Sequence, residues 1–90
     1  MDRITEKQLQ GAVDRLNRLA GTPLTPYLRV DGRSLPQAKC YHLDGAYGGV
    51  ALHQMCDEGT GVHDIFGGHM PKRELYYRIH AFISGLESAK

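Results

Sequence analysis

The chain has 90 residues, enough for one domain with a small hydrophobic core, so we expect a single domain over residues 1–90. Apolar residues make up 41% of it, charged residues make up 23%, and the composition is that of a folded protein rather than a disordered one. The formal net charge of +1 gives no support to a protein that binds nucleic acid or membranes by bulk charge, and it argues against an acidic DNA mimic.

The cysteines and the start of the chain indicate a cytoplasmic protein. Cys40 and Cys56 are the only cysteines, and we expect free thiols because the polar N-terminal segment does not have the pattern of a signal peptide. No apolar run approaches the roughly 18 residues that cross a bilayer. We therefore expect a cytoplasmic location and no membrane partner.

The first expected element is a helix that follows Thr5. Thr5 and Gln8 have the spacing of a capping box, in which each side chain bonds the backbone N–H of the other residue. Gly21 is placed to end the helix, and Pro23 forbids its continuation. Between these signals, apolar residues recur at helical spacing and form one face. That face consists of Leu9, Ala12, Val13, Leu16, Leu19 and Ala20.

Extended segments are expected next. The run "YLRV" (Tyr27–Val30) is typical of a short strand, and Asp31 followed by Gly32 is typical of a hairpin turn. The run "QAKCYHLDG" (37–45) gives a second extended segment. The run "GGVALHQM" (48–55) fits a helix or a strand, and a length of about eight residues favours a strand that forms a hairpin with the run before it.

The chain is expected to close with a long loop and a second helix. Residues 57–70 are rich in glycine, and loops of this length are usually functional or mobile. Pro71 suits the first helical position, Met70 is the expected cap, and residues 84–90 are expected to fray. The apolar stripe of this helix consists of Leu75, Ile79, Phe82, Ile83 and Leu86. The predicted fold is α+β, in the order helix, three-stranded antiparallel sheet, helix (αβββα), with both helices on one face of the sheet.

The start of the second helix is the best candidate for a binding site. Lys72 and Arg73 lie in its first turn, where each cation opposes the helix dipole at a cost of roughly 0.3–1 kcal/mol. Met70 offers no capping oxygen, so free backbone N–H groups and two cations together make a natural anion site. The alternative is that water caps the helix and both cations are merely solvated.

The five histidines and two cysteines do not make a convincing metal or catalytic site. His53, Cys56 and His63 lack the paired spacing of a structural zinc site. Cys56 and a histidine could in principle act as nucleophile and base, but the same pairing can be proposed for any small protein with this many histidines, so the signal is not specific. Whether His42 faces His53 depends on the register of the hairpin, which stays open. We expect no cofactor, no metal and no enzymatic activity.

Aromatic residues add candidates for contact with a partner. Tyr47 lies at the tip of the expected hairpin and Phe66 lies in the glycine-rich loop, and exposed aromatic side chains at loop tips suit a protein interface or base stacking. "GAYGG" (45–49) itself lacks the lysine and the strand-to-helix context of a phosphate loop. Three other aromatic residues are expected in the core: Tyr41, Tyr76 and Phe82. The predicted binding surface consists of Tyr47, Phe66, His69, Lys72 and Arg73.

Residues 39–86 resemble a family of small, largely uncharacterised proteins of tailed phages and prophages of proteobacteria. The shared motifs are a "YxLxxAYGG" hairpin, a "NEGGGV" turn, a glycine–histidine pair and a "KRELY" helix start. In this chain the turn reads "DEGTGV" (57–62), a small departure. The resemblance brings no established activity. It implies a phage accessory protein, and such proteins often bind a host protein, as inhibitors of CRISPR and other defence systems do.

We therefore expect a non-enzymatic binding module that acts on a host macromolecule in the host cytoplasm, with counter-defence (anti-CRISPR-like) inhibition as one form of that role. A host protein is the expected partner, and a homodimer is left open. The alternative is a nucleic-acid or phosphate-anion binder, because double-stranded-RNA-binding domains share the order helix, three strands, helix and hold phosphates at the start of the last helix. The near-neutral net charge counts against that alternative.

Overall fold

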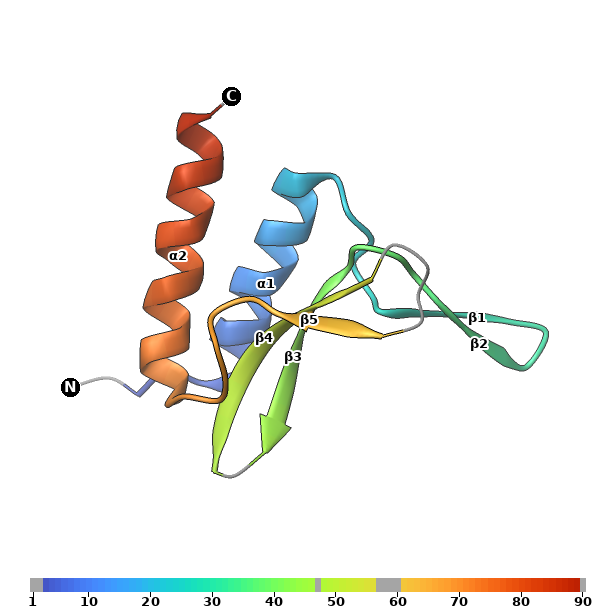
Figure 1. Cartoon of the computed structure of the whole chain (residues 1–90), viewed down its shortest axis with the longest axis horizontal. Helices are drawn as coiled ribbons and strands as arrows, with labels where there is room; N and C mark the ends of the chain where they lie inside the picture. Colours follow the sequence, from blue (N-terminus) through green and yellow to red (C-terminus); the bar gives the residue numbers. More distant parts are fainter. Residues whose placement is uncertain (1–2, 47, 57–60, 90) are drawn as a thin grey trace.

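The computed structural model describes residues 3–46, 48–56 and 61–89. In chain order its elements are α1 (Glu6–Ala20), β1 (Tyr27–Val30), β2 (Arg33–Pro36), β3 (Tyr41–Ala46), β4 (Gly49–Met55), β5 (Val62–Asp64) and α2 (Lys72–Ser88). Figure 1 shows the two helices beside the sheet of β3, β4 and β5, while β1 and β2 extend away from that body.

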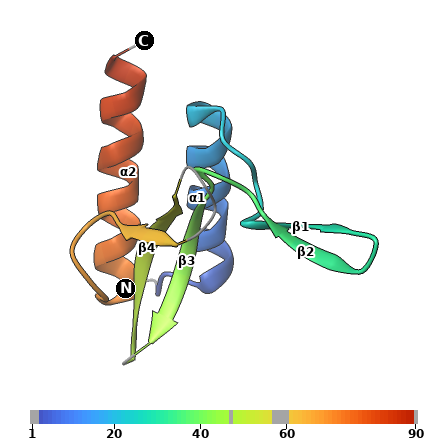
Figure 2. The same cartoon turned by 45° about the vertical axis from the view of Figure 1, so that its right-hand side comes forward.

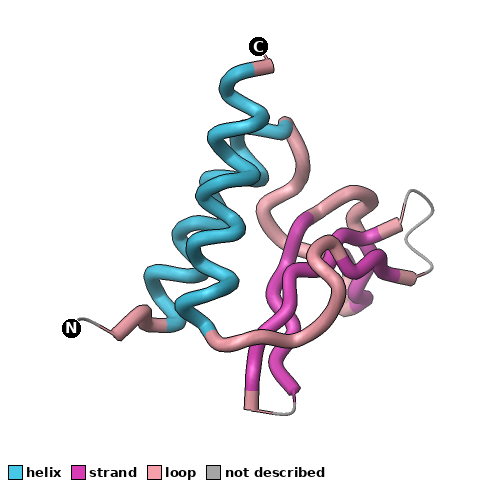
Figure 3. Tube along the Cα trace, turned by 60° about the vertical axis from the view of Figure 1, so that its left-hand side comes forward, coloured by secondary structure: helices cyan, strands magenta, loops and turns pink. Residues whose placement is uncertain are grey.

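The main sheet and the helices have the predicted arrangement. Strands β3, β4 and β5 form an antiparallel three-stranded sheet in the order β3-β4-β5. Helix α1 packs against β3, α2 packs against β4, and the helices pack against each other. Both helices lie on the same side of the sheet (Figure 3). The predicted α+β fold, with helices before and after a three-stranded sheet, is confirmed.

One strand of the main sheet differs from the prediction. Tyr27–Val30 does not join it but pairs with β2 in a separate two-stranded sheet. Asp31 (φ 49°) and Gly32 (φ 76°) both adopt left-handed conformations, which close a tight hairpin and bring residues 33–36 beside β1. The third strand of the main sheet is β5, which lies in the segment predicted as a loop.

Helix α1 follows the prediction at both ends. The backbone N–H of Gln8 donates to Thr5 Oγ1 at 3.1 Å, and the N–H of Thr5 donates to Gln8 Oε1 at 2.9 Å, which completes the capping box. Gly21 ends the helix in a left-handed conformation with φ 75°. Of the predicted apolar face, Leu19 is only partly buried and Ala20 is exposed. The buried residues of α1 are Leu9, Ala12, Val13, Leu16 and Asn17.

Helix α2 begins and ends later than predicted. Pro71 is its N-cap residue rather than its first helical residue, and the helix continues to Ser88. Met70 is not the cap because its backbone pairs with β4: the N–H and C=O of Met70 bond the C=O and N–H of Val50, both at 2.8 Å. In the part of the chain that the structure describes, no helix is long and apolar enough to cross a membrane.

The core lies between the helices and the face of the sheet that they cover. Tyr41 and Phe82 pack edge to face with ring centroids 5.9 Å apart, and Tyr76 lies at the margin of the core. The buried cluster consists of Leu9, Ala12, Val13, Leu16, Tyr41, Leu52, Met70, Leu75, Ile79 and Ile83. The core residues thus come from both helices, from β3 and β4, and from the segment that enters α2.

Asn17 joins α1 to the first residue of β3. Its side chain is fully buried, and its amide Nδ2 donates to the Tyr41 carbonyl at 2.9 Å. Its Oδ1 accepts from the Tyr41 N–H at 2.9 Å and from the Thr22 hydroxyl at 2.7 Å. The amide therefore bonds the edge of β3 at Tyr41 as a neighbouring strand would.

Candidate interaction surface: the arm and the groove

Two of the predicted binding residues, Phe66 and His69, lie in the segment between β5 and α2. A third, Tyr47, falls outside the described residues. Phe66 is partly buried, with its ring centroid 5.9 Å from that of Phe82, so its side chain lies against the core rather than displayed at a loop tip. His69 Nε2 lies 2.8 Å from Asp44 Oδ2, so its side chain contacts β3. The prediction that Phe66 is an exposed aromatic residue at a loop tip is therefore wrong.

The two predicted cations at the start of α2 also have contacts within the chain. Lys72 Nζ lies 3.5 Å from Glu6 Oε1, and the Arg73 guanidinium lies over the Tyr77 ring, 5.8 Å from its centroid. The N-cap residue Pro71 makes no side-chain hydrogen bond to the helix. Because Glu6 offsets the charge of Lys72, the attraction of this helix end for an anion is reduced. Anion binding here stays a prediction.

Histidines gather on the sheet face that points away from the helices. The register pairs His42 with His53, and their ring centroids are 5.8 Å apart. The rings of His53 and His69 are 6.2 Å apart, and His69 in turn contacts Asp44. Among the described residues, no group of three or more histidine, cysteine, aspartate or glutamate side chains is arranged to hold a metal ion. The geometry supports a contact between β3 and the segment before α2.

A separate contact joins the thiol of Cys56 to the imidazole of His63. Cys56 Sγ lies 3.5 Å from His63 Nε2, at the end of the sheet where β4 ends and β5 begins. Both cysteines are free, with Cys40 buried and Cys56 partly exposed. The expectation of no enzymatic activity remains a prediction.

We expect His42 to make the fold sensitive to acid. Burial lowers the pKa of His42 from its ordinary value of 6.5, the nearby His53 acts in the same direction, and His42 Nε2 is buried without a hydrogen-bond partner in the described structure. The unfolded chain therefore binds more protons between the folded and unfolded pKa values. Stability is fully present above pH 6.5 and falls as the pH decreases toward the folded pKa.

Urea unfolding between about pH 7.5 and about pH 5 measures this loss. A His42→Gln variant should lose less stability over this range than the wild type. The matched control is His63→Gln, since His63 is exposed on β5. An equal loss in the His42→Gln variant and in the wild type would contradict the assignment.

The β1–β2 hairpin forms an arm that stands away from the core (Figure 2). Every residue of both strands is exposed. Leu28 pairs with Leu35 and Val30 pairs with Arg33, so these side chains share one face of the hairpin. Leu28, Val30 and Leu35 are 50%, 41% and 45% exposed, and we call these three residues the apolar arm face.

The apolar arm face is exposed to water, which is unfavourable unless a partner covers it. A two-stranded hairpin is marginally stable by itself in water, and contiguous exposed apolar side chains mark interaction sites. Arg33 lies opposite Val30 on the same face, and arginine is enriched at protein interfaces. The sequence carried a signal for this surface in "YLRVDGRSL", where apolar residues lie on both sides of the Asp31–Gly32 turn. Residues 22–34 are rich in turn residues, so the sequence did not predict β2.

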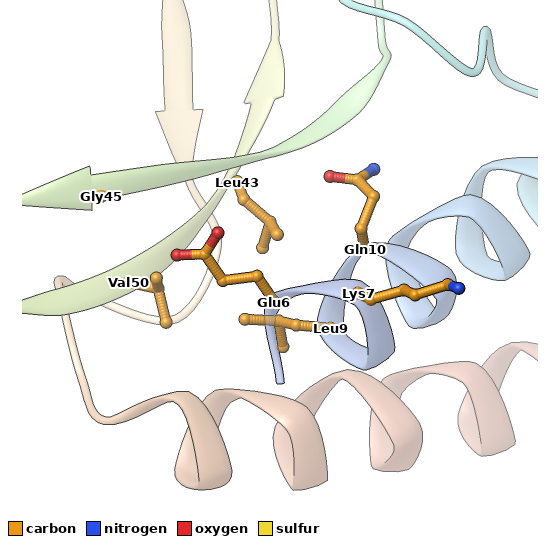
Figure 4. A pocket seen from close by; sticks show the side chains of 7 residues that line it. All are labelled: Glu6, Lys7, Leu9, Gln10, Leu43, Gly45 and Val50. Carbon is orange, nitrogen blue, oxygen red and sulfur yellow. The ribbon is translucent and has the colours of Figure 1, made fainter. Parts of the chain in front are cut away.

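A groove of about 480 Å³ lies between the first turns of α1 and the edge strand β3. Figure 4 shows Glu6, Lys7 and Gln10 on the helix and Leu43 and Gly45 on the strand side. The apolar part of the lining consists of Leu9, Leu43 and Val50. The groove therefore combines an apolar lining with a polar rim, as binding sites commonly do.

In the described part of the chain, no strand pairs with the outer edge of β3 beside this groove. β3 is the outer strand of the β3-β4-β5 sheet. Val50 lies opposite Gly45 and bonds Met70 through both of its backbone groups, so Gly45 and Val50 do not bond each other. In an antiparallel ladder the N–H and C=O of Gly45 then project from the outer edge. An edge of this kind accepts an added strand.

Comparison with known proteins adds no relative: no protein-family model, no curated protein and no solved structure matches the chain significantly.

Proposed function

We propose that this protein is a small phage or prophage accessory protein that acts as a non-enzymatic binding module on a protein of the host cytoplasm. Its contact surface is the apolar arm face. The observation that carries the proposal is that Leu28, Val30 and Leu35 are exposed together on a hairpin outside the buried core. Inhibition of a host defence system is one form that this role would take.

The chemistry of the arm supports a protein partner. Its centre is aliphatic, and Asp31 at the turn partly offsets the charge of Arg29 and Arg33. Burying the exposed half of the three apolar side chains would contribute on the order of 3 kcal/mol to binding. An apolar centre bordered by arginine is typical of protein interfaces, whereas binding to nucleic acid draws mainly on many cations placed against phosphates.

The alternative is a nucleic-acid binder that uses the start of α2. One observation favours it: both helices lie on one face of a three-stranded antiparallel sheet, and Lys72 and Arg73 begin the last helix. Double-stranded-RNA-binding domains share that topology, but a fold does not by itself imply a function. The contact between Lys72 and Glu6 weakens this alternative.

We expect the double variant Leu28→Lys with Leu35→Glu to lose the host partner. The two new side chains lie opposite each other with opposite charges, so the hairpin keeps a favourable cross-strand pair while its apolar centre is removed. Affinity capture from host lysate, followed by mass spectrometry, should recover a specific protein with the wild type and at least about tenfold less with this variant.

The matched control is Tyr77→Ser, which removes another exposed apolar side chain, 56% exposed, from α2. This control should capture as much of the same protein as the wild type. Equal capture by the arm variant would show that the partner binds elsewhere on the chain.

A further inference from the structure

We propose that two copies of this chain exchange arms: β1 of each copy adds as a fourth strand to the open edge of β3 in the other copy, beside the groove. This inference does not rest on the proposed function. It uses the outer edge of β1 and the face that carries Tyr27 and Arg29, which is opposite to the apolar arm face. The apolar arm face therefore stays available in the dimer.

On the outer edge of β1, Arg29 offers backbone groups for pairing, whereas the Tyr27 carbonyl already accepts a hydrogen bond from the Thr25 hydroxyl at 3.2 Å. Val30 and Arg33 flank the tight turn and form the hydrogen-bonded pair that closes it. Pairs alternate along an antiparallel ladder, so Arg29 and Ser34 do not bond each other, and the N–H and C=O of Arg29 project from the outer edge of β1. The outer edge of β2 is poorer because Pro36 has no N–H to donate.

The groove fits the side chains that this strand would bring. Residues that exchange hydrogen bonds across an antiparallel ladder lie opposite each other on the same face, so Tyr27 and Arg29 turn toward the face of Leu43 and Gly45. The Tyr27 side chain is exposed, and the apolar lining of the groove can cover its ring. At the rim, the side chain of Glu6 is 82% exposed; its Oε1 lies 3.5 Å from Lys72 Nζ, and its other carboxylate oxygen is the one that would meet the Arg29 guanidinium.

The arm that fills the groove must come from another copy. The groove lies at the first turns of α1, a 15-residue helix about 22 Å long, and the arm follows the other end of that helix. Figure 2 shows the arm directed away from the body of the molecule. Each copy has one arm and one groove, so a two-fold dimer makes the same contact twice and doubles the buried area.

Charge exchange tests the pairing of Arg29 with Glu6. Sedimentation equilibrium should show a wild-type dimer whose population grows with concentration in the micromolar range. Arg29→Glu alone and Glu6→Arg alone should each dimerise at least about tenfold more weakly, because each places like charges together. An equimolar mixture of the two variants should regain wild-type association, since both arm–groove contacts are then between opposite charges.

Two results would overturn the proposal: a wild type that stays monomeric at every concentration, or a mixture that associates no better than its components. Thermal unfolding of each variant shows whether the chain is folded. The variant Leu28→Lys with Leu35→Glu should dimerise like the wild type, because its changes lie on the other face of the arm. A monomeric wild type would contradict the dimer but not the proposed function. If the wild type dimerises and the variant Leu28→Lys with Leu35→Glu still binds the host partner normally, the dimer is supported and the proposed function is contradicted.

Discussion

Replacing Asn17 with alanine should lower the free energy of unfolding by roughly 2–4 kcal/mol. The reason is that the buried Asn17 amide makes hydrogen bonds of 2.9 Å with both the N–H and the C=O of Tyr41. Without the amide, the N–H of Tyr41 stays buried without a partner and its C=O keeps only the weak Cys40 thiol donor at 3.3 Å; each buried group left unsatisfied costs about 1–3 kcal/mol. Urea unfolding at neutral pH measures the difference.

The control for this change is Gln10→Ala in the same helix. The amide of Gln10 also makes a side-chain bond, to Asp14 at 3.0 Å, but this bond is exposed. Its removal should cost less than about 0.5 kcal/mol. If both variants lost the same small amount, the Asn17 amide would not be what joins α1 to β3.

Replacing Gly49 with alanine should lower the free energy of unfolding by about 1–3 kcal/mol. A Cβ atom at this position would lie 2.9 Å from the Met70 carbonyl oxygen and 3.2 Å from the backbone carbon and nitrogen of Met70. Met70 cannot move away easily because both of its backbone groups bond Val50. The change therefore strains the contact between β4 and the segment that enters α2.

Gly11→Ala is the matched control for Gly49→Ala. Gly11 lies in the exposed part of α1, and a Cβ there would meet nothing within 4 Å. Alanine should stabilise the helix by about 0.5–1 kcal/mol. Chemical denaturation of the two variants should move in opposite directions, and a Gly49→Ala variant as stable as the wild type would contradict the close approach of Met70.

The sequence predicts best where local signals decide the structure. The capping box of Thr5 and Gln8, the stop at Gly21 and the turn at Asp31 and Gly32 all act between near neighbours, and all are confirmed. β5 could not be predicted because it is short and follows a glycine-rich segment. Its strand conformation depends on pairing with β4, a contact that local propensity does not contain.

The candidate site depended more on contacts between distant segments. Lys72 and Glu6 are far apart in sequence and meet because α1 and α2 pack side by side, so the sequence overestimated the free charge at the start of α2. The apolar residues of the arm alternate along the sequence, as in a strand with one apolar face. The sequence does not show that this face is exposed, because burial of a hairpin depends on what packs against it. The groove exists only through the packing of α1 on β3.

The affinity of the purified protein for its captured host partner, measured by titration at low and high salt, tests the central claim most directly. The arm variant Leu28→Lys with Leu35→Glu should bind at least about tenfold more weakly than the wild type. The double variant Lys72→Ala with Arg73→Ala should bind as the wild type does, with little dependence on salt. The claim is contradicted if the arm variant binds normally while the Lys72 and Arg73 variant loses a strongly salt-dependent affinity, the behaviour of a nucleic-acid binder.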